Sequence, residues 1–259
     1  VISSGFRSPN IDDVGKIREK SGYVTVPNIN LKPEYAYNFE TSILKYFNER
    51  KFQTGLNIYY TLLNNYITRD YFEINNASTI MYEGEERTVI MYDGEEGIVV
   101  ANVNKGNAYI VGSTFSFKGN INDNWHSKGS LTYTKGKTYD TNQPLSSIPP
   151  LFGNIEIGFE KERFQASLSW RFNAKKRLED YNLIEGIDNL DQTPYNSQTN
   201  SYYGNPKWNT FSINSNYKLS NSITVFMNID NIFDIHYKEF ASSISAPGRN
   251  VSLSVLFNI

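Results

Sequence analysis

The sequence predicts an all-β fold, namely a transmembrane antiparallel up-and-down β-barrel with long strands. The first observation is the carboxyl end, where apolar side chains occupy every odd position from Val251 to Ile259. A two-residue period places such side chains on one face of an extended strand. Further segments repeat this alternation, and short polar turns and long loops alternate between them. A strand that keeps an apolar face to the chain end is typical of a closed barrel in lipid.

The composition also favours a barrel over a bundle of membrane helices. The 259 residues include 19 Tyr, 16 Phe and 3 Trp, yet the mean hydropathy is −0.50. The sequence contains no apolar run of about 18 residues, the length that a membrane helix needs. The formal net charge of −2 provides no basic field for nucleic acid. The absence of cysteine excludes disulfides and fits an oxidising compartment.

Nine strands are expected, each marked by apolar side chains two residues apart. In chain order these positions mark residues 39–47, 52–62, 109–117, 131–133, 155–159, 164–172, 211–219, 223–229 and 251–259. Tight polar turns rich in Asn, Ser and charged residues close four strand pairs, at 48–51, 122–124, 161–163 and 220–222. Residues 1–4 are expected to form the upper part of a tenth strand.

Long connections alternate with these short turns, as in outer-membrane barrels, whose external loops are longer than their periplasmic turns. The expected external loops are about 5–35, 69–106, 140–151, 174–207 and 232–248. A barrel with both ends in the periplasm needs an even number of strands. A chain that enters at the external end lacks at least the lower part of its first strand. We therefore expect residues 1–259 to be the C-terminal part of a larger barrel.

The opposite strand faces are polar, which favours a hydrated lumen over a packed core. They carry Gln53, Asn57, Gln165, Ser167, Ser169, Arg171, Asn214 and Asn216. A soluble β-sandwich also alternates polar and apolar residues. Its connections are not sorted into short and long by end, however, and strands of about 10–14 residues exceed its usual length. The barrel is therefore the preferred interpretation.

Four motifs, in the same order along the chain, resemble those of TonB-dependent outer-membrane receptors. Residues 5–10 (GFRSPN) resemble the FRAP box of that family, and residues 28–34 (NINLKPE) resemble its NPNLKPE box. Residues 102–112 (NVNKGNAYIVG) are similar to an N-x-G-x-A-x-I-x-G strand. Residues 231–249, with NIFD, Tyr237 and APGR, resemble the last external loop and the entry to the final strand.

The resemblance implies a barrel of about 22 strands around an N-terminal plug, of which this chain would supply about the last ten. The plug and the TonB box would lie outside this sequence. The implied partners are outer-membrane lipid, the TonB complex through that N-terminal region, and a small-molecule ligand. The implied function is active uptake of a scarce large solute across a Gram-negative outer membrane, with an iron chelate or haem preferred. A cobalamin-like or oligosaccharide receptor and a surface adhesin are the alternatives. No cofactor is expected.

Aromatic side chains in the expected loops are the main candidate ligand contacts, because they combine a large rigid area with a polar tip. Arg7, which could bridge neighbouring loops, and His236, which could bind haem or a metal, are added to them. The candidate ligand-binding residues are Arg7, Tyr23, Tyr71, Tyr82, Tyr92, Tyr181, Tyr195, Tyr202, Tyr203, Trp208 and His236. For any single tyrosine, loop packing or an interfacial aromatic girdle is the competing interpretation.

A short motif occurs twice, as MYEGEE at 81–86 and MYDGEE at 91–96. The repeat predicts a hairpin or two equivalent turns, with six carboxylates in the 14 residues 83–96. Carboxylate oxygens suit calcium, but no fixed ligand spacing supports a metal site. A solvated acidic hairpin is therefore preferred.

Histidine placement bears on both haem binding and catalysis. Haem receptors of the family that this chain resembles have an axial His between the first two boxes, and residues 11–27 contain none. Tyr23 could instead supply a phenolate ligand. His126 follows a short turn and is expected at the periplasmic end. His236 with Asp234 is the one external His–carboxylate pair, and both lie in a motif that the resemblance assigns to structure. We therefore expect no catalytic residues.

Overall fold

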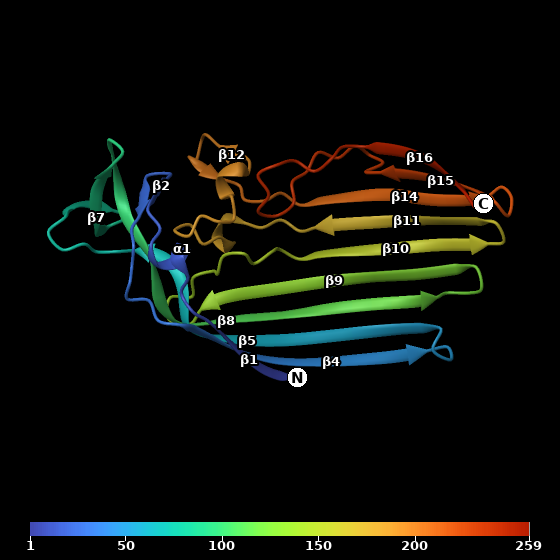
Figure 1. Ribbon diagram of the computed structural model, residues 1–259, viewed down its shortest axis with the longest axis horizontal. Coiled ribbons are helices and arrows are strands. Elements are labelled where there is room, and N and C mark those ends of the chain that lie inside the picture. Colours follow the sequence, from blue (N-terminus) through green and yellow to red (C-terminus); the bar gives the residue numbers. More distant parts are fainter. Residues whose placement is uncertain (259) are drawn as a thin grey trace.

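The computed structural model describes residues 1–258 as a wall of ten antiparallel strands with an ordered extension at one end (Figure 1). Neighbouring strands in the wall are also neighbours in the chain, apart from the small elements inserted in the loops. The wall consists of β1 (Ile2–Arg7), β4 (Glu34–Phe47), β5 (Phe52–Tyr71), β8 (Glu95–Asn120), β9 (Trp125–Thr138), β10 (Phe152–Lys161), β11 (Phe164–Asn173), β14 (Trp208–Lys218), β15 (Ile223–Asp230) and β16 (Asn250–Phe257). The all-β antiparallel prediction is confirmed.

The four expected short turns are also confirmed, and they lie together at the right-hand end of Figure 1. The first of them, between β4 and β5, has Asn48, Glu49 and Arg50 at positive φ, a conformation that Asn in particular tolerates. The long connections lie at the opposite end, so the wall has one end with tight turns and one end built of loops.

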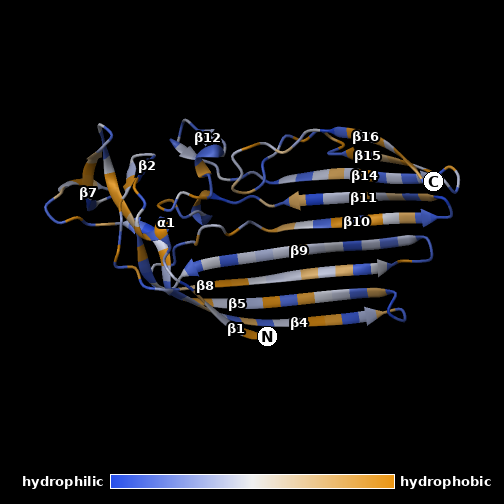
Figure 2. Cartoon of the chain, in the orientation of Figure 1, coloured by the Kyte–Doolittle hydropathy of each residue, from blue (hydrophilic) through white to orange (hydrophobic). Residues whose placement is uncertain are grey.

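One face of the wall is apolar across the strands, because the pairing register places the apolar positions of neighbouring strands opposite one another. Examples of these cross-strand pairs are Ile155 with Trp170, Leu168 with Ile213, and Met227 with Leu253. These side chains have no second layer on them, and Leu253 is 70% exposed. Figure 2 shows the alternation along the strands. Ile259, the last residue of the expected pattern, lies outside the described residues.

The other face is a hydrogen-bonded polar surface. Asn57 Nδ2 donates to Glu40 Oε1 at 2.6 Å and to Ser42 Oγ at 2.8 Å. Further along the wall, Ser130 Oγ donates to Asn154 Oδ1 at 2.6 Å. Polar networks of this kind are stable next to water, whereas exposed apolar side chains are stable next to hydrocarbon. The two faces are therefore those of a barrel wall between lipid and a hydrated lumen.

The prediction of a loop at 69–106 is wrong, because most of this segment is β-structure. β5 runs on to Tyr71 and β8 begins at Glu95, and a hairpin of β6 (Ser78–Tyr82) and β7 (Glu85–Tyr92) lies between them. From the loop at 8–33, β3 (Tyr23–Thr25) adds in parallel to β8, and β2 (Arg18–Lys20) pairs with β3. We call residues 18–25 and 66–105 together the extension.

A run of apolar residues explains why the extension is ordered. Val99 and Val100 of β8 are fully buried, as is Val24 of β3. A short continuous apolar run is typical of a strand that is covered on both faces, and the alternation rule does not detect it. The repeated MYxGEE motif forms two equivalent turns, as expected: Glu83-Gly84 and Asp93-Gly94 all have positive φ, which two-residue hairpin turns require.

β1 and β16 are the two edges of the wall, which is not closed within residues 1–258. The helices are short: α1 spans Ile11–Val14, and two 3₁₀ turns span Leu178–Asp180 and Leu190–Gln192. In this described part of the chain, no helix is long and apolar enough to cross a membrane. The total of about 22 strands stays a prediction.

Leu168→Arg tests the assignment of the apolar face to lipid. Leu168 lies in the middle of β11 and pairs with Ile157 and Ile213 on that face. An arginine at the bilayer midplane costs about 2–4 kcal/mol, so the variant should unfold at a lower urea concentration from lipid bilayers. Asn214→Arg, on the polar face of adjacent β14, is the matched control and should lose much less stability. Equal losses from both variants would contradict the assignment.

Candidate functional site

Arg7 ties the start of the first long loop to the wall. Its Nη1 lies 3.0 Å from Asp13 Oδ2, and its Nη2 lies 4.0 Å from Glu34 Oε2 of β4. Asp13 also caps α1 together with Asn10, whose side chain accepts from the Asp13 backbone N–H. Arg7 is therefore held by carboxylates of its own loop and of β4, and its contacts stabilise that loop.

The second and third motifs are joined to one another by asparagine side chains. Asn28 Nδ2 donates to the carbonyl of Asn102 at 2.8 Å. The Lys32 backbone N–H donates to Asn104 Oδ1 at 2.8 Å, and Asn104 Nδ2 donates to the Lys32 carbonyl at 2.9 Å. The motif residues thus form hydrogen bonds with backbone groups where the loop at 8–33 crosses β8. They position the extension against the first long loop.

Three of the candidate tyrosines come together on the extension. The hydroxyl oxygens of Tyr23 and Tyr82 are 3.3 Å apart, and the rings of Tyr23 and Tyr71 are 6.4 Å apart. The Arg87 guanidinium lies 3.7 Å from the centre of the Tyr71 ring, a cation–π contact. Burial raises the pKa of Tyr23, and the hydrogen bond between Tyr23 and Tyr82 raises the pKa of Tyr82 to about 12. The three tyrosines therefore pack as hydrogen-bonded and stacked side chains on the extension, and ligand contact by Tyr23 stays a prediction.

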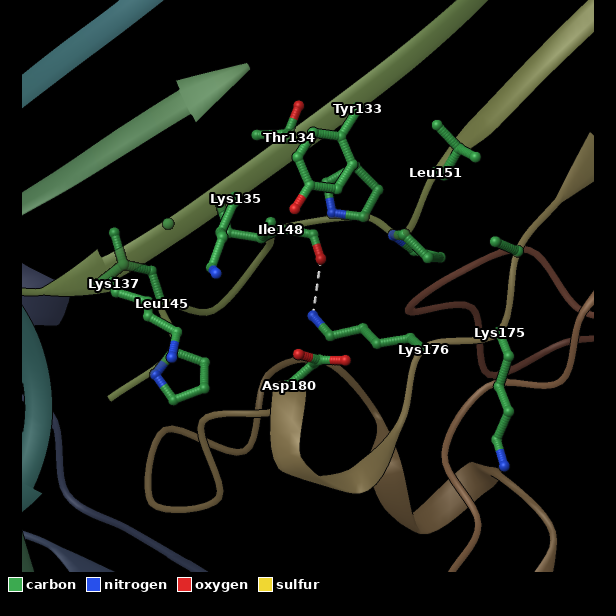
Figure 3. A pocket seen from close by; sticks show the side chains of 15 residues that line it. Tyr133, Thr134, Lys135, Lys137, Leu145, Ile148, Leu151, Lys175, Lys176 and Asp180 are labelled. Atoms are coloured by element: carbon green, nitrogen blue, oxygen red, sulfur yellow. Dashed lines mark hydrogen bonds between the residues drawn. The ribbon is translucent and has the colours of Figure 1, made fainter. Parts of the chain in front are cut away.

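A buried ion pair clamps the loops over the end of the wall. Lys176 Nζ lies 3.2 Å from Asp188 Oδ2, and both side chains are only 3% exposed. Lys176 Nζ also donates to the Ile148 carbonyl at 2.7 Å (Figure 3), and the Ser147 backbone N–H donates to Asp188 Oδ1 at 2.8 Å. Burial lowers the pKa of Lys176, and the Asp188 carboxylate opposes that shift. The pair thus joins the loop at 139–151 to the loop at 174–207.

The same clamp reaches the last loop through aromatic rings. Lys176 Nζ lies 4.3 Å from the Phe240 ring centre and 4.8 Å from the Tyr181 ring centre. Tyr181 is 4% exposed, its hydroxyl accepts from the Asn205 backbone N–H at 3.2 Å, and burial raises its pKa to about 12. Tyr181, a candidate ligand contact, therefore packs between loops and is not open to a ligand. The sequence alone did not reveal that burial.

A cavity of about 560 Å³ lies where the polar face meets these loops. Arg171 of β11 crosses it, with Nη2 at 2.9 Å from Glu239 Oε1 and its guanidinium 5.7 Å from the ring centre of Trp208. Trp208 is 7% exposed and lies 4.3 Å from Tyr237, centre to centre. The lining combines aromatic walls with Arg171, Glu156 and Glu239, as ligand pockets do. We call this cavity the lumen pocket.

The lumen pocket differs from the sequence-based candidates in its main polar residue. The sequence predicts Arg171 as a lumen residue, whereas Glu239 and Glu156 are not among the predicted candidates. Arg171 lies on the polar face only two residues from the loop end of β11, and this position favours a role near the loops. Trp208 was a candidate and does line the pocket, although little of its surface is open.

The other candidates are spread over the loop surface. A small hairpin consists of β12 (Tyr195–Asn196) and β13 (Ser201–Tyr202). Tyr195 and Tyr202 pair across it with rings 5.1 Å apart, and Tyr203 follows it, half exposed. Tyr92 is exposed at the end of β7, away from the tyrosine cluster of the extension. For these residues ligand contact stays a prediction.

His236 does not form a catalytic pair with Asp234. His236 Nε2 lies 2.9 Å from Ser245 Oγ, while Asp234 Oδ1 accepts from the Arg249 backbone N–H at 2.7 Å. Asn231 Nδ2 donates to the carbonyl of Ile235 at 2.9 Å in the same segment. These contacts close the last loop onto β16. Within residues 1–258, no group of three or more His, Asp or Glu is arranged to hold a metal ion.

A wall with a lipid face, a hydrated face and a loop-covered pocket defines an outer-membrane receptor barrel. The chain belongs to the family described as "TonB dependent receptor-like, beta-barrel", whose model matches residues 2–232. This membership places it in the outer membrane of a Gram-negative bacterium.

Relatives with curated descriptions are haemoglobin-binding proteins. The chain is 27% identical over 191 residues to "Probable hemoglobin and hemoglobin-haptoglobin-binding protein 4" of Haemophilus influenzae, covering 70% of this chain and 18% of that protein. It is 24% identical over 286 residues to "Hemoglobin-binding protein A" of Haemophilus influenzae, covering 98% of this chain and 27% of that protein. The chain thus spans only about a quarter or less of these relatives.

Solved structures share the fold at low identity. The copper transporter OprC aligns over 100% of this chain and 36% of its own, with a TM-score of 0.70 and 18% identity. The siderophore receptor PirA from Acinetobacter baumannii aligns over 99% of this chain and 38% of its own, with a TM-score of 0.66 and 16% identity. These matches support the barrel-wall assignment and carry no ligand assignment.

Lys176→Met tests whether the ion pair holds the loops. Loss of one partner leaves a buried, uncompensated Asp188, which costs about 3–5 kcal/mol. We expect faster hydrogen exchange in residues 142–150 and 182–190, measured by mass spectrometry, with unchanged exchange in β14 and β15. The double variant Lys176→Met with Asp188→Leu removes both charges and should recover part of the protection. Unchanged exchange in the single variant would contradict the clamp.

Proposed function

We propose that this chain is the ligand-binding and wall portion of a receptor for TonB-dependent active uptake of an iron chelate or haem. The observation that carries the proposal is the lumen pocket, which lies on the hydrated face directly below the clamped loops. A solute bound there is inside the barrel and on its route inward. The TonB complex would act through an N-terminal region outside this sequence.

The chemistry of the lumen pocket suits a flat, conjugated ligand with acidic groups. Trp208 and Phe240 contribute aromatic rings to its lining. Arg171 pairs with Glu239 through Nη2, and its other N–H donors can pair with a ligand carboxylate. Haem and aromatic iron chelates carry both a conjugated ring system and acidic groups.

The relatives favour haem as the solute, obtained from a haem protein. Both Haemophilus influenzae relatives are described as haemoglobin-binding, and their similarity covers most of this chain. A cobalamin-like or oligosaccharide ligand, or an adhesin role for the loops, is the second candidate, since exposed tyrosines such as Tyr195 and Tyr203 suit sugars and proteins as well. We propose no catalytic activity, because His236 and Asp234 are each engaged in holding the last loop.

Growth on defined iron sources tests the proposed uptake. A strain that lacks the gene should fail to grow with haem or haemoglobin as the sole iron source, and a plasmid copy should restore growth. Growth on ferrous sulfate serves as the control for general fitness. Inactivation of TonB in the complemented strain should abolish the restored growth. Normal growth of the deletion strain on haem, haemoglobin and ferric citrate would contradict uptake of iron compounds.

Arg171→Ala tests the lumen pocket itself. Removal of one charge-assisted contact should weaken haem binding by about tenfold, measured from the absorbance change on titrating the complete receptor in detergent. Gln165→Ala is the matched control, because Gln165 lies on the same face of the same strand near the short turn. Equal affinity in Arg171→Ala and the unmodified receptor would place the ligand elsewhere.

A further inference from the structure

A second cavity, of about 490 Å³, lies outside the lumen pocket and is lined mainly by charged side chains. It is bounded by the first long loop, the extension and the segment around Gly186. Its cationic residues are Arg7, Lys16, Arg18, Lys20 and Arg69, and its acidic residues are Asp12, Asp13 and Glu185. We call it the cationic cavity.

The acidic residues of the cavity do not neutralise most of its cations. Asp13 pairs with Arg7, as described above. Glu185 is half-buried and accepts from Thr68 Oγ1 at 3.2 Å; burial raises its pKa, and the nearby Arg69 guanidinium opposes that shift. Within residues 1–258, no carboxylate oxygen lies within 4.0 Å of a side-chain nitrogen of Lys16, Arg18, Lys20 or Arg69.

Arg69 is held in place by backbone groups and not by an acid. Its Nε donates to the Ile184 carbonyl at 2.6 Å. Gly186 adopts a left-handed conformation with φ 62°, and a Cβ at that position would lie 2.9 Å from Arg69 Nη2. Glycine therefore leaves room for the guanidinium. Lys20 Nζ donates to the Gly186 carbonyl at 3.2 Å, so the same turn positions a second cation.

The arrangement is costly without a ligand. Arg69 lies beyond the membrane-spanning part of β5, in the extension. Burial lowers its pKa because the charged form is poorly solvated, and the nearby Glu185 opposes that shift. Several like charges around one cavity also repel one another. An anion that accepts from Arg69 and Arg18 would relieve both effects, since a planar guanidinium binds two oxygens at once.

We propose that the cationic cavity binds an oxyanion, a carboxylate or phosphate group, between Arg69, Arg18 and Lys20. Two sources share this chemistry. One is an acidic group of the solute taken up. In that case the cavity is an outer binding site for the solute, and the inference rests on the proposed function. The other is the phosphate of an outer-membrane lipid. The site is separate from the lumen pocket, because no residue lines both cavities.

The test is isothermal titration of citrate and, separately, inorganic phosphate into the complete receptor in detergent. We expect saturable binding that weakens as salt rises. Arg18→Gln, an exposed position that should not disturb folding, and Arg69→Gln should each weaken binding by about tenfold. Arg163→Gln, an exposed cation in a short turn at the opposite end, is the matched control and should bind as the unmodified protein does.

Competition then separates the two sources. Displacement of citrate by haem assigns the site to the solute, and displacement by lipid A in micelles assigns it to lipid. The proposal is overturned if neither anion binds saturably, or if Arg18→Gln and Arg163→Gln bind equally well. A strain that grows on haem while its receptor binds no anion would reject this cavity and leave the proposed uptake intact.

Discussion

The register of the ten wall strands is the constraint on which the rest of the structure depends. Side chains alternate between faces with a period of two, so a slip of one residue in any strand would move its apolar side chains to the hydrated face. Pairs such as Leu168 with Ile213 and Met227 with Leu253 show that no strand has slipped. Because backbone groups in hydrocarbon must be paired within the protein, the same register also satisfies the hydrogen bonds of the wall.

The loop end is held by a different kind of interaction. Its stability depends on buried polar contacts between segments that are distant in the chain, above all Lys176 with Asp188 and the Ile148 carbonyl. A buried ion pair gains little net free energy over an apolar pair, but its partners must meet in one geometry. It is therefore suited to fixing how loops lie over a pocket. The asparagines of the motifs do the same for the extension.

This division separates the motif residues that hold the loops from the main proposed ligand contacts. The motifs contain residues that hydrogen-bond to backbone groups of the loops and the extension. Arg171, Arg69 and Arg18, the proposed ligand contacts of the lumen pocket and the cationic cavity, lie outside the motifs. Motif residues contribute to the lining as well, through Glu239 in the lumen pocket and Arg7 and Asn102 in the cationic cavity. Proteins that share the wall at 16–18% identity can thus carry different ligands on it.

The sequence by itself determined the strands, the four short turns, the two faces and the family, because each depends on a pattern within about ten neighbouring residues. Only the tertiary structure decided that residues 69–106 are largely β-structure and that Tyr181 lies buried beside Lys176. It also decided which charges share a cavity: Lys20 meets Gly186 across 166 residues of chain. Contacts at such separations depend on how loops pack together, and no local pattern of residues encodes that packing.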